Sequence, residues 1–126
     1  MRVLIVDDSS FITLFCRQAL QKAGYEVVGE AYDGEEAVKM AFQHKPQLIL
    51  MDIALPKKNG FEAAKAIMEK LPRTKIIAIS ALEEEWVGER YKQSGCVAFL
   101  AKPFDVKTLM ENIEKIFDPD GELMYG

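Results

Sequence analysis

The sequence has 126 residues, 49% of them hydrophobic and 29% charged, which fits one globular domain and excludes a disordered or low-complexity chain. Sixteen Lys and Arg against 20 Asp and Glu give a net charge of −4, so the basic surface of a direct nucleic-acid binder is not expected. The apolar run in the start MRVLIVDDSS is too short for a signal peptide, and no apolar stretch of the sequence approaches the length of a membrane span. We therefore expect a cytoplasmic protein, in which Cys16 and Cys96 are free buried thiols.

The first half of the chain predicts two strand–helix pairs. Val3–Val6 is short and β-branched, as buried parallel strands are. A helix follows, and we expect it to end at Gly24. Its expected apolar stripe consists of Phe11, Leu14, Phe15 and Ala19. Tyr25–Val28 predicts the second strand, and Asp33 with Glu36 predicts a capping box that opens the second helix.

The second half of the chain predicts three more such pairs. The strands are expected at Leu48–Met51, Ile76–Ile79 and Val97–Leu100. Gly60–Leu71 has a helical apolar face that Pro72 ends, and the glutamates from Glu83 favour the start of a fourth helix that Gly95 closes. Asp105 is the expected cap of the fifth helix. Its apolar stripe consists of Val106, Leu109, Ile113 and Ile116.

The alternation of strands and helices predicts the fold class. Connections long enough to hold a helix imply parallel strands with right-handed crossovers. We expect an α/β domain over residues 1–117, with a five-stranded parallel sheet and five helices on its two faces. Residues 118–126, DPDGELMYG, contain turn signals without periodicity and are predicted to be a C-terminal tail.

Polar residues follow four of the five predicted strands. Asp7 and Asp8 follow the first, Asp52 the third, Ser80 the fourth and Lys102 the fifth. Each residue alone has a commoner structural role, as a cap, a turn former or a solvated charge. However, ligands of open parallel sheets bind beyond the carboxyl ends of the strands, where these residues are predicted to meet.

The predicted cluster of carboxylates needs positive charge. Two carboxylates about 4 Å apart repel each other by about 4 kcal/mol at an effective dielectric constant near 20. A set of oxygen ligands with few donors suits Mg²⁺, and Lys102 supplies a second, fixed positive charge. Carboxylates, a hydroxyl group, a lysine and Mg²⁺ together favour phosphoryl transfer onto a carboxylate.

These residues resemble the receiver domains of two-component response regulators. The resemblance rests on Asp7-Asp8, Asp52 in MDIALPKKNG, Ser80 in IIAISA and Lys102-Pro103-Phe104. It extends from about Arg2 to Phe117, in order and at family spacing. It implies the strand order 2-1-3-4-5 and a phosphoryl group taken from the phosphohistidine of a sensor histidine kinase or a phosphotransfer protein.

The resemblance also implies the roles of the acidic residues. Asp52 is the implied phosphoacceptor. Asp8 and Asp52 are the implied direct ligands of Mg²⁺, together with the backbone carbonyl of Ala54. Asp7 is expected to act mainly through a bound water.

By the same resemblance, Ser80 and Lys102 each contact a phosphoryl oxygen, and the Lys102–Pro103 bond is cis. Phe99 takes the position of the switch aromatic, where the chemotaxis member has Tyr, so a partner contact through a tyrosine hydroxyl is not expected. Movement of Ser80 and Phe99 implies a changed face of the fourth helix, fifth strand and fifth helix that controls a downstream protein. The candidate residues of that face are Trp86, Val87 and Tyr91.

Several alternatives remain open at this stage. An aspartyl-phosphate phosphatase has a second acid two residues after the nucleophile, where this chain has Ala54. A flavin carrier needs a hydroxyl-rich phosphate loop, where this chain has Asp7 and Asp8. The chain is expected to catalyse its own phosphorylation and dephosphorylation, but to act primarily as a signalling switch. Three contexts remain open: a stand-alone regulator, the receiver half of a longer regulator, or an inactive pseudo-receiver. Two oligomeric states also remain open, a monomer and a phosphorylation-dependent dimer.

Overall fold

The computed structural model describes residues 1–81 and 93–117, which contain five strands and four helices. The elements are β1 (Arg2–Val6), α1 (Ser10–Lys22), β2 (Glu26–Ala31), α2 (Gly34–His44), β3 (Leu48–Asp52), α3 (Gly60–Lys70), β4 (Lys75–Ser80), β5 (Ala98–Ala101) and α5 (Val106–Ile116). Most of the predicted fourth helix falls on residues 82–92 and the predicted tail on residues 118–126, both outside the described residues.

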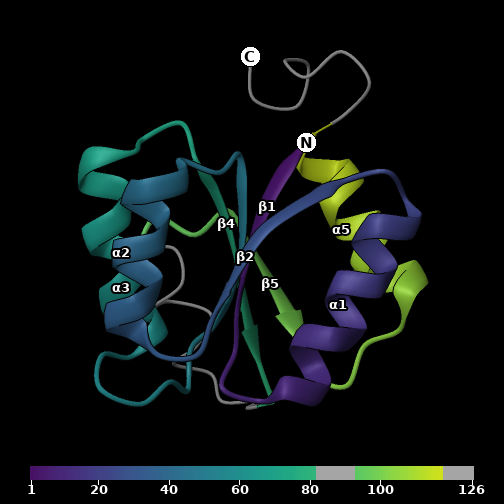
Figure 1. Ribbon diagram of the computed structural model, residues 1–126, viewed down its shortest axis with the longest axis horizontal. Coiled ribbons are helices and arrows are strands. Elements are labelled where there is room, and N and C mark those ends of the chain that lie inside the picture. The colour runs from purple at the N-terminus through teal and green to yellow at the C-terminus, as the bar shows by residue number, and fades with distance from the viewer. Residues whose placement is uncertain (82–92, 118–126) are drawn as a thin grey trace.

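The five strands form one parallel sheet in the order β2-β1-β3-β4-β5, which confirms the predicted topology. Helices α2 and α3 cover one face of the sheet, and α1 and α5 cover the other (Figure 1). Because every connection returns the chain to the same edge, all strands have their carboxyl ends together, at the bottom of Figure 1. None of the described helices has the length and apolar character that a membrane crossing requires.

The sheet is buried on both faces, which explains its continuous apolar strands. In β3, all five residues are buried. Ile49 and Met51 pack with α2 and α3, whereas Leu48 and Leu50 pack with α1 and α5. Strand β2 lies at the sheet edge and is only partly buried, so its bounds differ most from the predicted Tyr25–Val28.

Helix caps determine the residues at which two of the helices begin. The Oδ1 atom of Asp33 accepts the Glu36 N–H at 2.7 Å, and Asp105 accepts the Thr108 N–H at 2.8 Å. Both predicted caps are confirmed. The Glu36 carboxylate, however, accepts the N–H of Tyr32 at 2.7 Å, so the reciprocal bond closes one residue earlier than the capping box predicts.

The predicted buried stripe of α1 is wrong at two positions. Phe11 is 74% exposed and Leu14 is 52% exposed. The predicted burial of Ala19 is confirmed, and the other buried residues of α1 are Thr13, Cys16 and Leu20. Val106, predicted in the stripe of α5, is also exposed. Apolar residues occur on more than one side of α1, and packing against the sheet and α5 buries the side that contains Cys16. Cys16 and Cys96 are both buried free thiols, as predicted.

Candidate functional site

The carboxyl edge of the sheet brings the predicted acidic residues together. Asp7 directly follows β1, where its N–H donates to the carbonyl of Ala31 at 3.0 Å, and Asp52 is the last residue of β3. Asp7 and Asp52 are buried, whereas Asp8 is exposed. One carboxylate oxygen from each of the three lies within 4.8 Å of the others. The adjacent strands β1 and β3 therefore create the cluster that the sequence predicted.

Lys102 connects the two buried carboxylates. Its Nζ atom lies 2.8 Å from Oδ2 of Asp7 and 3.3 Å from Oδ2 of Asp52. Its backbone N–H donates to the carbonyl of Ser80 at 2.8 Å, which fixes it at the end of β5. Burial lowers the pKa of Lys102, but the two carboxylates raise it more, so its pKa lies above the ordinary value of 10.5. The lysine is therefore charged at neutral pH.

Asp52 is held in an unfavourable environment for its charge. Burial raises the pKa of its carboxyl group, the N–H of Ala54 lowers it by donating to Oδ1 at 3.0 Å, and Asp7 raises it again. Lys102 lowers it, and the net result is a pKa above the ordinary value of 3.8. The buried carboxylate is thus only partly compensated by the protein itself.

The donor set fits a small, hard cation. Oδ1 of Asp7 accepts the N–H of Ser9 at 2.9 Å. Its Oδ2 atom is buried and has the Lys102 ammonium as ion-pair partner, but accepts no bond of hydrogen-bond geometry. Asp7, Asp8 and Asp52 together carry three negative charges, and Lys102 balances one of them. Two negative charges therefore remain unbalanced. Carboxylate oxygens at one open edge are compatible with Mg²⁺, which binds through few carboxylates and retains waters.

Ser80 and Phe99 lie on the same face of the sheet. Ser80 is the buried last residue of β4 and pairs with Ala101, whereas Phe99 pairs with Ala78, two positions earlier. Phe99 is half-buried and packs against the core on the side of α2 and α3. The switch role that the resemblance implies for these two residues stays a prediction.

The remaining predicted positions are distributed as follows. Ala54 is exposed just after β3, with its backbone directed at Asp52 through the N–H bond. The Lys102–Pro103 peptide bond is cis, as the resemblance implied. The face candidates Trp86, Val87 and Tyr91 lie outside the described residues.

Sequence reasoning missed the importance of Gly60 for the site. A Cβ atom at this position would lie 2.3 Å from the carbonyl oxygen of Asp52 and 2.6 Å from Cα of Ile53. The Gly60 N–H donates to the carbonyl of Ile53 at 3.0 Å, so the start of α3 packs directly against the end of β3. The sequence showed this glycine only as the first residue of a helix.

Comparison with known proteins agrees with this arrangement. The sequence pattern of the response regulator receiver domain matches residues 3–114. The chain belongs to this family. The chemotaxis protein CheY of Thermotoga maritima is 40% identical over 115 residues, which cover 91% of this chain and 96% of that protein. The transcriptional regulatory protein PdtaR of Mycobacterium tuberculosis is 40% identical over 113 residues, or 90% of this receiver domain, which spans only 55% of PdtaR.

Solved structures show the same fold. The response regulator domain of Thermotoga maritima CheB is 38% identical, with a TM-score of 0.81 and coverage of 92% of both chains. A chain of the CheX–CheY–BeF3–Mg²⁺ complex from Borrelia burgdorferi is 32% identical, with a TM-score of 0.89 and coverage of 93% of this chain and 89% of that one. This chain therefore has the receiver fold over the 92–93% of its length that these structures cover.

Proposed function

We propose that this receiver domain accepts a phosphoryl group on Asp52 from the phosphohistidine of a sensor histidine kinase or a phosphotransfer protein. The observation that carries the proposal is the Lys102 ammonium, which lies within 3.3 Å of both buried carboxylates at the edge of the sheet. A helix cap or a turn carboxylate needs no such partner. Membership of the receiver family supports the same assignment.

In the proposed reaction, a carboxylate oxygen of Asp52 forms the new P–O bond while the P–N bond of the phosphohistidine breaks. The histidine nitrogen keeps the electron pair of that bond and takes up a proton from solvent. Lys102 and the hydroxyl group of Ser80 would each contact a phosphoryl oxygen. Because the charge moves onto these oxygens, catalysis rests on positioning and charge neutralisation. The acyl phosphate is later hydrolysed by water.

The residues proposed to hold Mg²⁺ are Asp8, Asp52 and the backbone carbonyl of Ala54, with Asp7 acting through a water. The ion would neutralise charge on the transferred group. The unbalanced negative charge of the cluster supports this assignment, as does the buried Asp7 Oδ2, which accepts no hydrogen bond in the described structure.

The proposed output is a change in protein contacts. A phosphoryl group adds about −1.5 to −2 charge and strong acceptors, which draw the hydroxyl group of Ser80 toward Asp52. Phe99 then turns into the vacated space, since both side chains lie on one face of the sheet. The face of the fourth helix, β5 and α5, with Trp86, Val87 and Tyr91, is proposed to bind the downstream protein or a second copy of the chain.

Intact mass after incubation with acetyl phosphate tests the chemistry. We expect an adduct of one phosphoryl group that needs Mg²⁺ and disappears in Asp52→Asn. Asp33→Asn is the matched control, because Asp33 caps α2 and is not one of the three clustered carboxylates. No adduct on the wild type would indicate a pseudo-receiver, and an adduct on Asp52→Asn would refute the assignment of the acceptor.

Phe99→Ala tests the output separately. The variant should take up phosphate like the wild type, but phosphorylation should no longer change its affinity for the partner or its dimerisation. Loss of phosphorylation itself would refute a pure switch role for Phe99. We also propose a cytoplasmic location, which the free thiols of Cys16 and Cys96 favour because such thiols persist in reducing compartments.

A further inference from the structure

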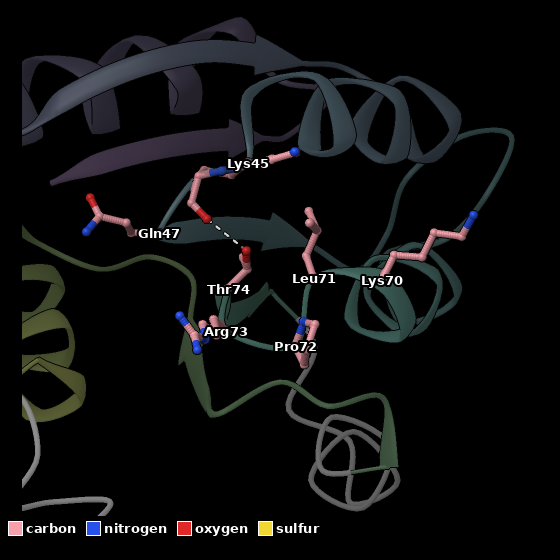
Figure 2. Close-up of a pocket in the computed structure, with 8 residues that line it drawn as sticks. Lys45, Gln47, Lys70, Leu71, Pro72, Arg73 and Thr74 are labelled. Atoms are coloured by element: carbon pink, nitrogen blue, oxygen red, sulfur yellow. Dashed lines mark hydrogen bonds between the residues drawn. The ribbon is translucent and has the colours of Figure 1, made fainter.

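A second charged site lies at the amino ends of β3 and β4, the edge of the sheet opposite Asp52. A pocket of about 340 Å³ opens there between the α2–β3 loop and the α3–β4 loop. Its size falls at the lower end of small-molecule sites, which measure about 300–1,000 Å³. Lys45, Lys70 and Arg73 contribute charged side chains to its lining, and Figure 2 shows these side chains at separate positions on the two loops and the end of α3.

The walls of the pocket are apolar and tied together by hydrogen bonds. Pro46, Leu71 and Pro72 line it between the charged side chains. The buried hydroxyl group of Thr74 donates to the carbonyl of Pro46 at 2.8 Å, the dashed line in Figure 2, and its N–H donates to the carbonyl of Leu71 at 3.1 Å. Two prolines and these bonds hold both loops in place, so the pocket is preformed.

The positive charge at this edge is not balanced by nearby carboxylates. Arg2 extends the cluster, because its Nη1 atom donates to the carbonyl of Lys45 at 3.3 Å. Within residues 1–81 and 93–117, no carboxylate lies within ion-pair distance of Arg2, Lys45, Lys70 or Arg73, and the described ion pairs belong to other cations. The Lys70 ammonium lies 5.7 Å from the ring centroid of Phe42, a cation–π contact that leaves its positive charge uncancelled. Together these four cations form a local field that attracts anions.

We propose that this pocket binds a nucleoside diphosphate or a similar small organic phosphate. Several cations around one opening suit a multiply charged anion, and the planar guanidinium of Arg73 suits phosphate oxygens in particular. The apolar wall of Pro46, Leu71 and Pro72 provides a surface for a flat base. This binding activity lies beyond the proposed phosphoryl transfer and uses none of its residues.

The geometry favours a small ligand over an extended polyanion. A nucleic-acid strand needs a positively charged groove that follows its backbone over several nucleotides. Here the charges surround a single pocket at two loops, and the chain as a whole is acidic. A small molecule can place its charged end among the cations and its apolar end against the wall at once.

Fluorescence anisotropy of ADP that carries an N-methylanthraniloyl label tests the proposal. The titration is made in EDTA, so that no metal ion can bring phosphates to the carboxylate cluster. The test variant is Lys70→Gln/Arg73→Gln, and the control with the same charge change is Lys22→Gln/Lys65→Gln, at exposed positions elsewhere. Asp52→Asn serves as a second control for the phosphorylation site.

We expect saturable binding that weakens by about tenfold or more in the test variant, as for the loss of two charge-assisted contacts. The control pair and Asp52→Asn should bind like the wild type. Unlabelled ADP should displace the probe at lower concentration than inorganic phosphate. Absence of saturable binding, or equal weakening in both double variants, would overturn the proposal. Equal displacement by inorganic phosphate would overturn the role of the apolar wall.

Discussion

Replacing Lys102 by Met should destabilise the fold in a pH-dependent way. The ammonium lies 2.8 Å from Asp7 and 3.3 Å from Asp52, which corresponds to about 6 and about 5 kcal/mol of Coulomb energy at an effective dielectric constant near 20. Desolvation cancels much of this energy, and the side chain is 19% exposed, so water screens part of the rest. Removal of one partner of a buried pair costs about 3–5 kcal/mol. We expect the lower end, about 3 kcal/mol, at neutral pH.

The sign of the pH dependence follows from the groups involved. The Lys102 pKa is raised, so in the wild type its contribution is present below 10.5 and is lost only as the pH rises through the raised value. In the variant, Asp52 lacks this counter-ion, so its charged form becomes still less favourable in the fold. The difference in unfolding free energy between the two proteins should therefore shrink as the pH falls toward about 4 and Asp52, whose pKa is raised, becomes protonated.

Urea denaturation in EDTA, followed by circular dichroism at several pH values between about 4 and 8, measures this difference. EDTA removes any divalent cation that could replace the ammonium. Lys65→Met is the matched control, because Lys65 is exposed in α3, and its loss should be small at every pH. A constant difference between the wild type and Lys102→Met across this range would refute the electrostatic reasoning and point to lost packing instead.

Three further predictions concern Asp52, Gly60 and the two cysteines. Asp52→Asn should raise the unfolding free energy of the metal-free protein near neutral pH, because the raised pKa of Asp52 shows that its charged form is unfavourable in the fold. This gain in stability should vanish below pH 3.8, the ordinary pKa of an aspartate. A variant that is no more stable than the wild type in urea titrations near neutral pH would contradict the prediction. Gly60→Ala should cost about 1–3 kcal/mol, since its Cβ would overlap the backbone of Asp52; a cost below about 0.5 kcal/mol would contradict the close approach. Cys16 and Cys96 should react with Ellman's reagent near pH 8 far more slowly in the native than in the urea-unfolded chain, because burial raises their pKa values to about 12 and about 11; equal rates would contradict their burial.

Local sequence signals were sufficient for the elements and their order. The β-branched runs, the Asp33 and Asp105 caps and the alternation of strands with helices are short-range features, because capping and strand formation depend on nearby residues. The parallel sheet followed from connection length. The convergence of Asp7, Asp52 and Lys102 followed in turn, since parallel strands share one carboxyl edge.

Only the tertiary structure decided which surfaces meet. The apolar residues of α1 allowed more than one buried side, and contact with the sheet and α5 left Phe11 and Leu14 exposed. The need for glycine at position 60 depends on how closely α3 approaches β3, which no local pattern encodes. Likewise, charge alone did not reveal that Lys45 and Arg73 share a pocket, because their loops are adjacent only after β3 and β4 have paired. Distances between segments that are far apart in the chain depend on packing, and packing is a property of the whole fold.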